Sequence, residues 1–241
     1  MTVAYRSSLA IVFQGRAEDI LPGFEKGSVD CLITDPPYGQ AYAGSGYRTE
    51  SEVAPVMEGD GPGDHVTEVL RLCCGLLKNN RHLYVFGPNR MNGLPVTEPG
   101  TLIWNKGKTP HPSGSTCWSK THEPIQVSTY VPSQANRDRG DGRLAVRLRR
   151  GSVLSVPRKN SRAVNRHPTE KPVALLQQLV EASSCVGETV LDPYAGSGST
   201  LVAAVLSGRR AIGIEIDPGY CDTMVTRVKQ AEGLVLEMGR L

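Results

Sequence analysis

The chain has 241 residues, which fits one large α/β domain or one domain with a small insert. Hydrophobic residues make up 39% of it, enough for a core, yet no apolar run reaches the roughly 18 residues of a membrane span. The six cysteines show no C-x-x-C spacing and no His pair at ligand spacing. Because the N-terminus also lacks a signal pattern, we expect a cytoplasmic protein with reduced cysteines, no metal and no membrane contact.

The net charge of +3 is unevenly distributed along the chain. Segment 131–166 holds ten basic and two acidic residues, a net charge of +8, whereas the remainder has 17 basic and 22 acidic residues and carries −5. A concentrated basic segment on an acidic body indicates a polyanionic partner. The alternative is a solvated charged loop.

Hydrophobic periodicity predicts alternating strands and helices in the first part of the chain. We expect strands over 8–14, 29–34 and 83–86, and helices over 17–24 and 65–77. These elements alternate as they do in a sheet whose strands are joined by crossover helices.

The second part of the chain begins with consecutive strands. Strands over 101–104 and 124–131 have no helix between them, which predicts a hairpin at one sheet edge. Further elements are expected as a strand over 152–156, a helix from about 171 to 183, a strand over 189–191, a helix to about 206, a strand over 211–216 and a helix over 218–231.

The tetrapeptide Asp35-Pro36-Pro37-Tyr38 follows the buried strand 29–34. Prolines have no backbone donor, so the chain must leave the sheet there and present Asp35 and Tyr38 at its carboxyl edge. The Asp35 carboxylate and the Pro36 carbonyl are acceptors suited to the N–H bonds of an exocyclic amino group, and Tyr38 offers a flat face to an unstacked base. The alternative is a strand that ends in a Pro-Pro turn with a capping Asp.

A second nucleotide-binding pattern lies over 189–217, where a strand, a glycine-rich turn, a helix and a strand end in an acidic residue. Gly196 and Gly198 allow the backbone to approach a ligand closely. Glu215 is placed to bind two ribose hydroxyls.

Two common phosphate-binding motifs are incomplete in this pattern. No lysine precedes Ser199, as a P-loop requires, and position 201 is leucine where the dinucleotide fingerprint needs glycine. Adenosine with a zwitterionic amino-acid tail therefore fits better than a diphosphate. Asp192 is suited to its ammonium group and Lys171 to its carboxylate.

Five segments, in a fixed order, carry a resemblance to a known family. They are TDPPYG at 34–39, HEPI at 122–125, HPTEKP at 167–172, DPYAGSGST at 192–200 and GIEID at 213–217. Over about residues 8–230 the chain resembles the β-class amino-methyltransferases that act on DNA with S-adenosyl-L-methionine. In that class the catalytic tetrapeptide precedes the cofactor glycines, and target recognition lies between them.

The resemblance implies a class I, Rossmann-like methyltransferase fold of the α/β class. Its sheet would be mixed, mostly parallel and seven-stranded, with helices on both faces, in a single domain over 1–241 with 131–166 as a target-recognition insert. Catalytic roles are implied for Asp35, Pro36, Pro37 and Tyr38. Cofactor contacts are implied for Asp35, Thr169, Lys171, Asp192, Tyr194, Gly196, Ser197, Gly198, Ser199 and Glu215.

The implied reaction is attack of an exocyclic base nitrogen on the sulfonium methyl of S-adenosyl-L-methionine, in double-stranded DNA. Asp at position 35 favours adenine N6, with cytosine N4 as the alternative. Methylation at cytosine C5 is rejected because the chain has no Pro-Cys dipeptide. DNA contacts are expected from Tyr42, Tyr47, Arg48, Arg147, Arg149, Arg150 and Arg158.

Other functions and states stay open at this point. Relatives that methylate protein glutamine or an RNA base usually carry Asn-Pro-Pro-Tyr after the glycine motif, the opposite order. An inactive DNA-binding protein on the same scaffold is a further alternative, which the intact motifs disfavour. A homodimer is an alternative to a monomer.

The chain departs from the family pattern in three places. The family usually has Asp after the first-strand glycine, whereas Gly15 is followed by Arg16, so either Glu18 or Asp19 substitutes or the contact is absent. Tyr194 stands where Phe is commoner. The short recognition segment argues against a long target sequence. In addition, the loop 40–63, with seven glycines and prolines, is expected either to order over a flipped base or to be a passive surface insertion.

Overall fold

The structure, a computed structural model, describes residues 2–37, 64–88, 90–107, 121–133, 150–157 and 170–239. Several predictions lie outside these residues, namely those on Tyr38, the loop 40–63 with Tyr42, Tyr47 and Arg48, and Arg147, Arg149, Arg158 and Thr169.

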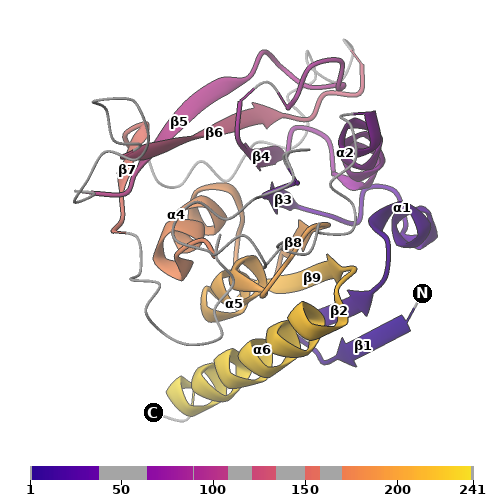
Figure 1. The fold of residues 1–241 in the computed structure, drawn as a ribbon, viewed down its shortest axis with the longest axis vertical. Coiled ribbons are helices and arrows are strands. Elements are labelled where there is room, and N and C mark those ends of the chain that lie inside the picture. Colours follow the sequence, from indigo (N-terminus) through magenta and orange to yellow (C-terminus); the bar gives the residue numbers. More distant parts are fainter. Residues whose placement is uncertain are drawn as a thin grey trace, which may run out of the picture.

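The strands of the described residues form one sheet in the order β1-β2-β9-β8-β3-β4-β6-β5-β7 (Figure 1). The five central strands, from β2 to β4, are parallel. The β1 strand runs antiparallel to β2, β6 runs antiparallel to both β4 and β5, and β7 pairs with β5 in parallel. The bounds are β1 Thr2–Arg6, β2 Ala10–Gln14, β3 Cys31–Thr34, β4 His82–Phe86, β5 Gly100–Asn105, β6 His122–Thr129, β7 Val153–Ser155, β8 Thr189–Asp192 and β9 Arg210–Glu215.

This mixed, mostly parallel sheet confirms the predicted fold class, and the β5–β6 hairpin confirms the predicted reversed edge. The described residues form nine strands in place of the seven expected. Both ends of the sheet are extended, by β1 on one side and by the three-residue β7 on the other. The β1 strand was not predicted, because its residues are mostly exposed and carry no apolar alternation.

Helices cover both faces of the sheet, as expected (Figure 1). Alternate strand residues face opposite sides, so Ile33 packs with α4 and α5 while Leu32 packs with α2. Because both faces are covered, the central strands are apolar almost throughout. The helices are α1 Ala17–Ile20, α2 Asp64–Leu76, α4 Val173–Ser183, α5 Ser199–Leu206 and α6 Pro218–Met238, and a 3₁₀ turn spans Leu21–Gly23.

The strand order reverses between β3 and β8, which lie side by side. From β3 the chain passes through α2 to β4 on one side, and from β8 it passes through α5 to β9 on the other. The two helices lie on opposite faces, since they belong to different core clusters. Open α/β sheets bind ligands at such a reversal, at the carboxyl ends of the strands.

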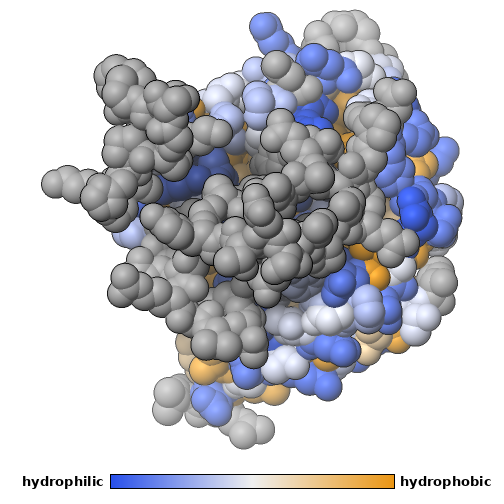
Figure 2. Space-filling view, viewed as in Figure 1, coloured by the Kyte–Doolittle hydropathy of each residue, from blue (hydrophilic) through white to orange (hydrophobic). Residues whose placement is uncertain are grey.

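The last helix, α6, lies along β1 and β2 at the lower side of Figure 1. Hydrophobic and hydrophilic residues mix on its outer surface in Figure 2, and its final turns expose Leu234, Leu236 and Met238. Within the described residues no helix is both long and apolar enough to cross a membrane.

Candidate functional site

The ends of β3 and β8 are joined by a side-chain hydrogen bond at the reversal point. Thr34 donates from Oγ1 to Asp192 Oδ1 at 2.9 Å, and the same carboxylate oxygen accepts from the backbone N–H of Tyr194 at 3.1 Å. Asp192 is buried, and this burial raises its pKa to about 6, against hydrogen bonds from Thr200 and Thr34 that lower it. The two predicted motifs therefore meet, as the sequence led us to expect.

The glycine turn after β8 requires glycine for two different reasons. Gly198 has a φ of +83°, and a Cβ there would lie 2.5 Å from Met224 Cγ, so only glycine fits between the turn and α6. Gly196 has a φ of +52°, but a Cβ there would meet no atom within 4 Å. The turn thus packs against the protein at Gly198 and leaves open space at Gly196.

Glu215, at the end of β9, is held beside this turn by backbone donors. Its Oε2 accepts from Gly196 N–H at 2.7 Å and its Oε1 from Asp217 N–H at 2.9 Å. Burial raises the pKa of Glu215, although these donors act in the opposite direction. The carboxylate is thereby fixed at the carboxyl edge, where the sequence predicted it.

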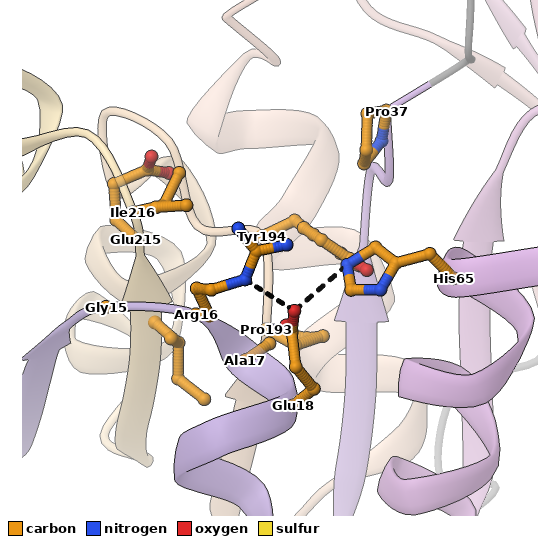
Figure 3. Close-up of a pocket in the computed structure, with 11 residues that line it drawn as sticks. Gly15, Arg16, Ala17, Glu18, Pro37, His65, Pro193, Tyr194, Glu215 and Ile216 are labelled. Atoms are coloured by element: carbon orange, nitrogen blue, oxygen red, sulfur yellow. Dashed lines mark hydrogen bonds and ion pairs between the residues drawn. The ribbon is translucent and has the colours of Figure 1, made fainter. Parts of the chain in front are cut away.

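A cavity opens between the ends of β2, β3, β8 and β9 (Figure 3). In Figure 3, Glu215 and Ile216 face His65 across it, and Pro37 lies at its upper side. The lining comes from the turn after β2 (Gly15, Arg16, Ala17, Glu18), from Pro37 after β3, from His65 on α2, from Pro193 and Tyr194 after β8, and from Ile214, Glu215 and Ile216.

Of the two acidic candidates after Gly15, the structure brings Glu18 to the cavity and leaves Asp19 exposed. Glu18 Oε1 accepts from Arg16 Nε at 2.7 Å and lies 3.6 Å from His65 Nε2, as the dashed lines in Figure 3 show. Burial raises the pKa of Glu18, but Arg16 and His65 outweigh it and the net shift is downward. Glu18 is therefore an ionised acceptor at the cavity wall.

Tyr194 lines the cavity and brings a buried polar atom to it. Its hydroxyl is buried and has no hydrogen-bond partner among the described residues. Burial also raises its pKa, so the group stays a neutral donor. An unpaired buried hydroxyl costs free energy unless a bound group or water satisfies it.

Four alternating charges lie at the carboxyl edge of the sheet, on segments far apart in sequence. Lys171 Nζ donates to Asp35 Oδ2 at 2.5 Å and lies 3.4 Å from Glu123 Oε2, and Lys106 donates to the other oxygen of Glu123. Lys171 also lies over the Phe86 ring, with Nζ 4.9 Å from the ring centroid. The predicted residue Lys171 thus contacts two carboxylates, one of which, Glu123, the sequence did not single out as a site residue.

Arg227 on α6 joins two of the predicted motifs, which sequence reasoning missed. Its guanidinium donates to the Ser197 carbonyl at 2.7 Å, to Ser199 Oγ at 3.2 Å and to Glu170 Oε1 at 3.0 Å. It therefore ties the glycine turn to the residue before Lys171. No local signal marks Arg227, because α6 has the pattern of an ordinary amphipathic helix.

One predicted DNA contact lies away from this site. Arg150 Nη2 donates to Glu181 Oε2 at 3.0 Å, in the last turn of α4. Lys171 precedes the first turn of the same helix, so about eight residues of helical rise, roughly 12 Å, lie between the start of α4 and the residue that pairs with Arg150. The structure does not bring Arg150 to Asp35.

A doubly wound sheet with an acidic turn and a glycine turn at its reversal point has the arrangement of the α/β proteins that bind nucleotide-like ligands. The family follows from comparison with known proteins. Residues 29–226 match the family N6_N4_Mtase, described as DNA methylase, and the chain belongs to this family.

Individual relatives cover most of the chain. The Escherichia coli (strain K12) protein YubD is 32% identical over 222 residues, which is 86% of this chain and 85% of YubD. The solved structure of TTHA0409 from Thermus thermophilus, complexed with S-adenosyl-L-methionine, matches with a TM-score of 0.62 at 23% identity, covering 92% and 95% of the two chains. The cytosine-N4-specific PvuII DNA methyltransferase matches with a TM-score of 0.64 at 16% identity, covering 98% and 95%.

Proposed function

We propose that this member of the DNA methylase family transfers a methyl group to the exocyclic N6 of adenine in double-stranded DNA. The observation that carries the proposal is the position of Asp35. It follows β3 at the reversal point, its side chain is 21% exposed, and Pro37, two residues on, lines the cavity. To accept a hydrogen bond from the amino group of a base, a carboxylate must be both fixed in position and accessible.

S-adenosyl-L-methionine is the cofactor of the family, and the cavity fits its adenosine end. Glu215, fixed by two backbone donors, is suited to the two ribose hydroxyls. The open space at Gly196 is where a Cβ would intrude on a ligand, and the Tyr194 hydroxyl is a donor without a partner among the described residues. Glu18 is the acceptor we assign to the adenine amino group, in place of the family's Asp.

When bound, the cofactor supplies an electrophilic methyl group on a sulfonium. Asp35 and the Pro36 carbonyl accept the N–H bonds of the base amino group, which localises the nitrogen lone pair for attack. Tyr38 stacks on the flipped base. Lys171 fixes the Asp35 carboxylate by its 2.5 Å contact. In this mechanism most of the rate enhancement comes from positioning and electrostatics.

Adenine is favoured over cytosine by Asp at position 35, where the cytosine-N4 enzymes more often have Ser. The fold does not discriminate, since the cytosine-N4-specific PvuII enzyme shares it. The test is to incubate the protein with duplex DNA and labelled S-adenosyl-L-methionine, and to identify the methylated nucleoside by mass spectrometry. We expect N6-methyladenine. If N4-methylcytosine is the only product, the target base is cytosine and not adenine. If no labelled nucleoside is found on duplexes of varied sequence, the proposal is overturned.

We further propose that the basic segment 131–166 contacts the DNA backbone. Its net charge of +8 supports this, and Pro157, which precedes Arg158, follows β7 at the same sheet edge as Asp35. Affinity for DNA should fall steeply with salt, because each neutralised phosphate releases counterions. Arg147→Gln together with Arg149→Gln should flatten this salt slope, whereas Arg150→Gln, which loses its contact with Glu181, should change it less. An unchanged slope in the double variant would leave the segment as a solvated loop.

A further inference from the structure

The network around Lys171 contains two residues to which the proposed reaction gives no role, Glu123 and Lys106. Glu123 lies near the start of β6, and Lys106 directly follows β5. Their strands pair as a hairpin in which Asn105 faces His122. Because β6 runs antiparallel to β4, the hairpin tip lies at the carboxyl edge of the sheet, beside Asp35.

Within this network Lys171 is shared between two carboxylates. Its Nζ lies 2.5 Å from Asp35 Oδ2 and 3.4 Å from Glu123 Oε2, and its side chain is only 9% exposed. Burial lowers the pKa of Lys171, but Asp35 and Glu123 together raise it above its ordinary value. The ammonium therefore stays charged, and its interaction is divided between the two acids.

The division matters for an acceptor. A carboxylate that is fully committed to a neighbouring cation is a weaker acceptor for a new N–H bond, because the cation withdraws its charge. Glu123 takes up part of the positive charge of Lys171, and Lys106 in turn holds Glu123 from the other side. Another charged group close to Asp35 in the described residues is Asp192 at the end of β8, which is bonded to Thr34 and lies outside the network.

We infer that Glu123 is a positioning residue of the methyl-transfer reaction, which acts through Lys171 to orient Asp35 and to keep it a strong acceptor, and that Lys106, which pairs with Glu123, limits the share of Lys171 that Glu123 takes. The inference rests on the proposed role of Asp35. It assigns a function to the tip of the β5–β6 hairpin, which is anchored to the catalytic turn through these charges.

The test is the Glu123→Gln variant, measured by methyl-transfer kinetics and by the pH dependence of kcat. The amide cannot share the charge of Lys171, so we expect kcat to fall by about tenfold, with less than about a threefold change in cofactor affinity. Loss of the negative charge also leaves the positive charge of Lys171 undivided beside Asp35. The acidic limb of the pH–rate profile should therefore move to lower pH.

A general loss of stability in the variant would move the acidic limb of the pH–rate profile to higher pH instead. A destabilised protein unfolds at higher pH on the acid side, so its acidic limb would move up together with the midpoint of acid unfolding. The matched control is Glu68→Gln, which removes the same kind of group from an exposed ion pair with Arg71 at 2.6 Å on α2 and should leave kcat and the profile unchanged.

Lys106→Met provides the second arm. Without Lys106, Glu123 takes a larger share of Lys171, so the acidic limb should move to higher pH while the midpoint of acid unfolding stays in place. The double variant Lys106→Met/Glu123→Gln should behave like Glu123→Gln alone, because Lys106 acts only through Glu123.

Asp35→Ala separates this inference from the function on which it rests. An active Asp35→Ala protein would overturn the catalytic assignment itself. If Asp35→Ala is inactive but Glu123→Gln keeps a normal kcat and an unshifted pH profile, only the positioning role of Glu123 is overturned. Additive effects of the Lys106 and Glu123 substitutions would likewise contradict the proposed order of action.

Discussion

The two edges of the sheet each carry a cluster of alternating charges, and the clusters differ in how their carboxylates are satisfied. At the amino edge, Asp30 precedes β3 and is 1% exposed, with Lys78 Nζ at 2.7 Å and Arg81 Nη2 at 3.3 Å. At the carboxyl edge, Asp35 follows the same strand and is 21% exposed. One strand thus separates a buried carboxylate from an accessible one.

The amino-edge cluster has the properties of a structural network. Asp30 Oδ2 accepts from the backbone N–H of Thr189, and Arg81 forms two hydrogen bonds, at 2.7 and 3.0 Å, with Glu188. These contacts tie the starts of β3, β4 and β8 together. The carboxyl-edge cluster instead keeps the Asp35 carboxylate partly exposed, which indicates that the accessibility of the carboxylate, and not the number of ion pairs, distinguishes a site from a structural network.

The largest expected effect on stability comes from the amino edge. Asp30→Ala removes an acceptor from Lys78, from Arg81, which keeps Glu188, and from the Thr189 N–H, and should lower the free energy of unfolding by about 3 kcal/mol. Methyl transfer per folded molecule should be unchanged. Denaturant unfolding with an activity assay checks both, with Asp222→Ala, an exposed carboxylate on α6, as the control. A stable but inactive Asp30→Ala protein would contradict the claim that the amino edge is structural and the carboxyl edge catalytic.

At the carboxyl edge, by contrast, the ionised carboxylate of Asp192 should destabilise the folded protein as the pH rises. Its pKa of about 6 lies above the unfolded value of about 3.9, so its contribution to stability is fully present below pH 4 and is lost as the pH rises through 6. Asp192→Asn keeps an acceptor for Thr34, removes this pH dependence, and should stabilise the protein by about 2 kcal/mol at pH 7.

Thermal unfolding from pH 4 to pH 7 measures this effect. Cofactor affinity should fall in the same Asp192→Asn variant if Asp192 meets the ammonium group of the cofactor. An unfolding temperature that changes with pH in the same way in both proteins would show that folding leaves the pKa of Asp192 unchanged, and the claimed cost of placing a buried carboxylate at the site would be wrong.

A smaller effect, confined to cofactor binding, is expected at Glu215. Glu215→Ala removes the carboxylate that we assign to the ribose hydroxyls, and should weaken S-adenosyl-L-methionine binding by about 1–3 kcal/mol. Calorimetry measures the affinity, and Glu237→Ala on the exposed end of α6 is the control. Unchanged affinity would mean that the ribose is held elsewhere and that the cavity in Figure 3 takes another part of the ligand.

Much of the fold was predictable because its signals are local. The central strands are short apolar runs that end at Asp35, Asp192 and Glu215, and their periodicity reflects a sheet that is covered on both faces. The last helix extends to Met238, beyond the predicted end at 231, because its final turns are exposed and carry little periodic signal. The exposed strand β1 was missed for the same reason.

The site was predictable only in part, because motifs identify residues but not their partners. The sequence places Asp35 and Glu215 at strand ends and Gly198 in the turn before a helix, and the structure finds them there. It gives no sign that Lys171 pairs with Glu123, 48 positions earlier, or that Arg227 reaches Glu170, since such contacts depend on tertiary packing. The charge pattern likewise gave no sign that Arg150, which we predict to contact DNA, pairs with Glu181.

The most direct test of the account is methyl transfer by Asp35→Ala, measured with labelled S-adenosyl-L-methionine beside cofactor affinity and thermal unfolding. Because Asp35 lies at an accessible strand end and Lys171 keeps Glu123 as a partner, the variant should fold and bind cofactor nearly as the wild type does. Transfer should fall by at least about a hundredfold, the scale of a lost electrostatic group in a transition state. Substantial transfer by the folded variant would contradict the assignment of the carboxyl edge as the catalytic site.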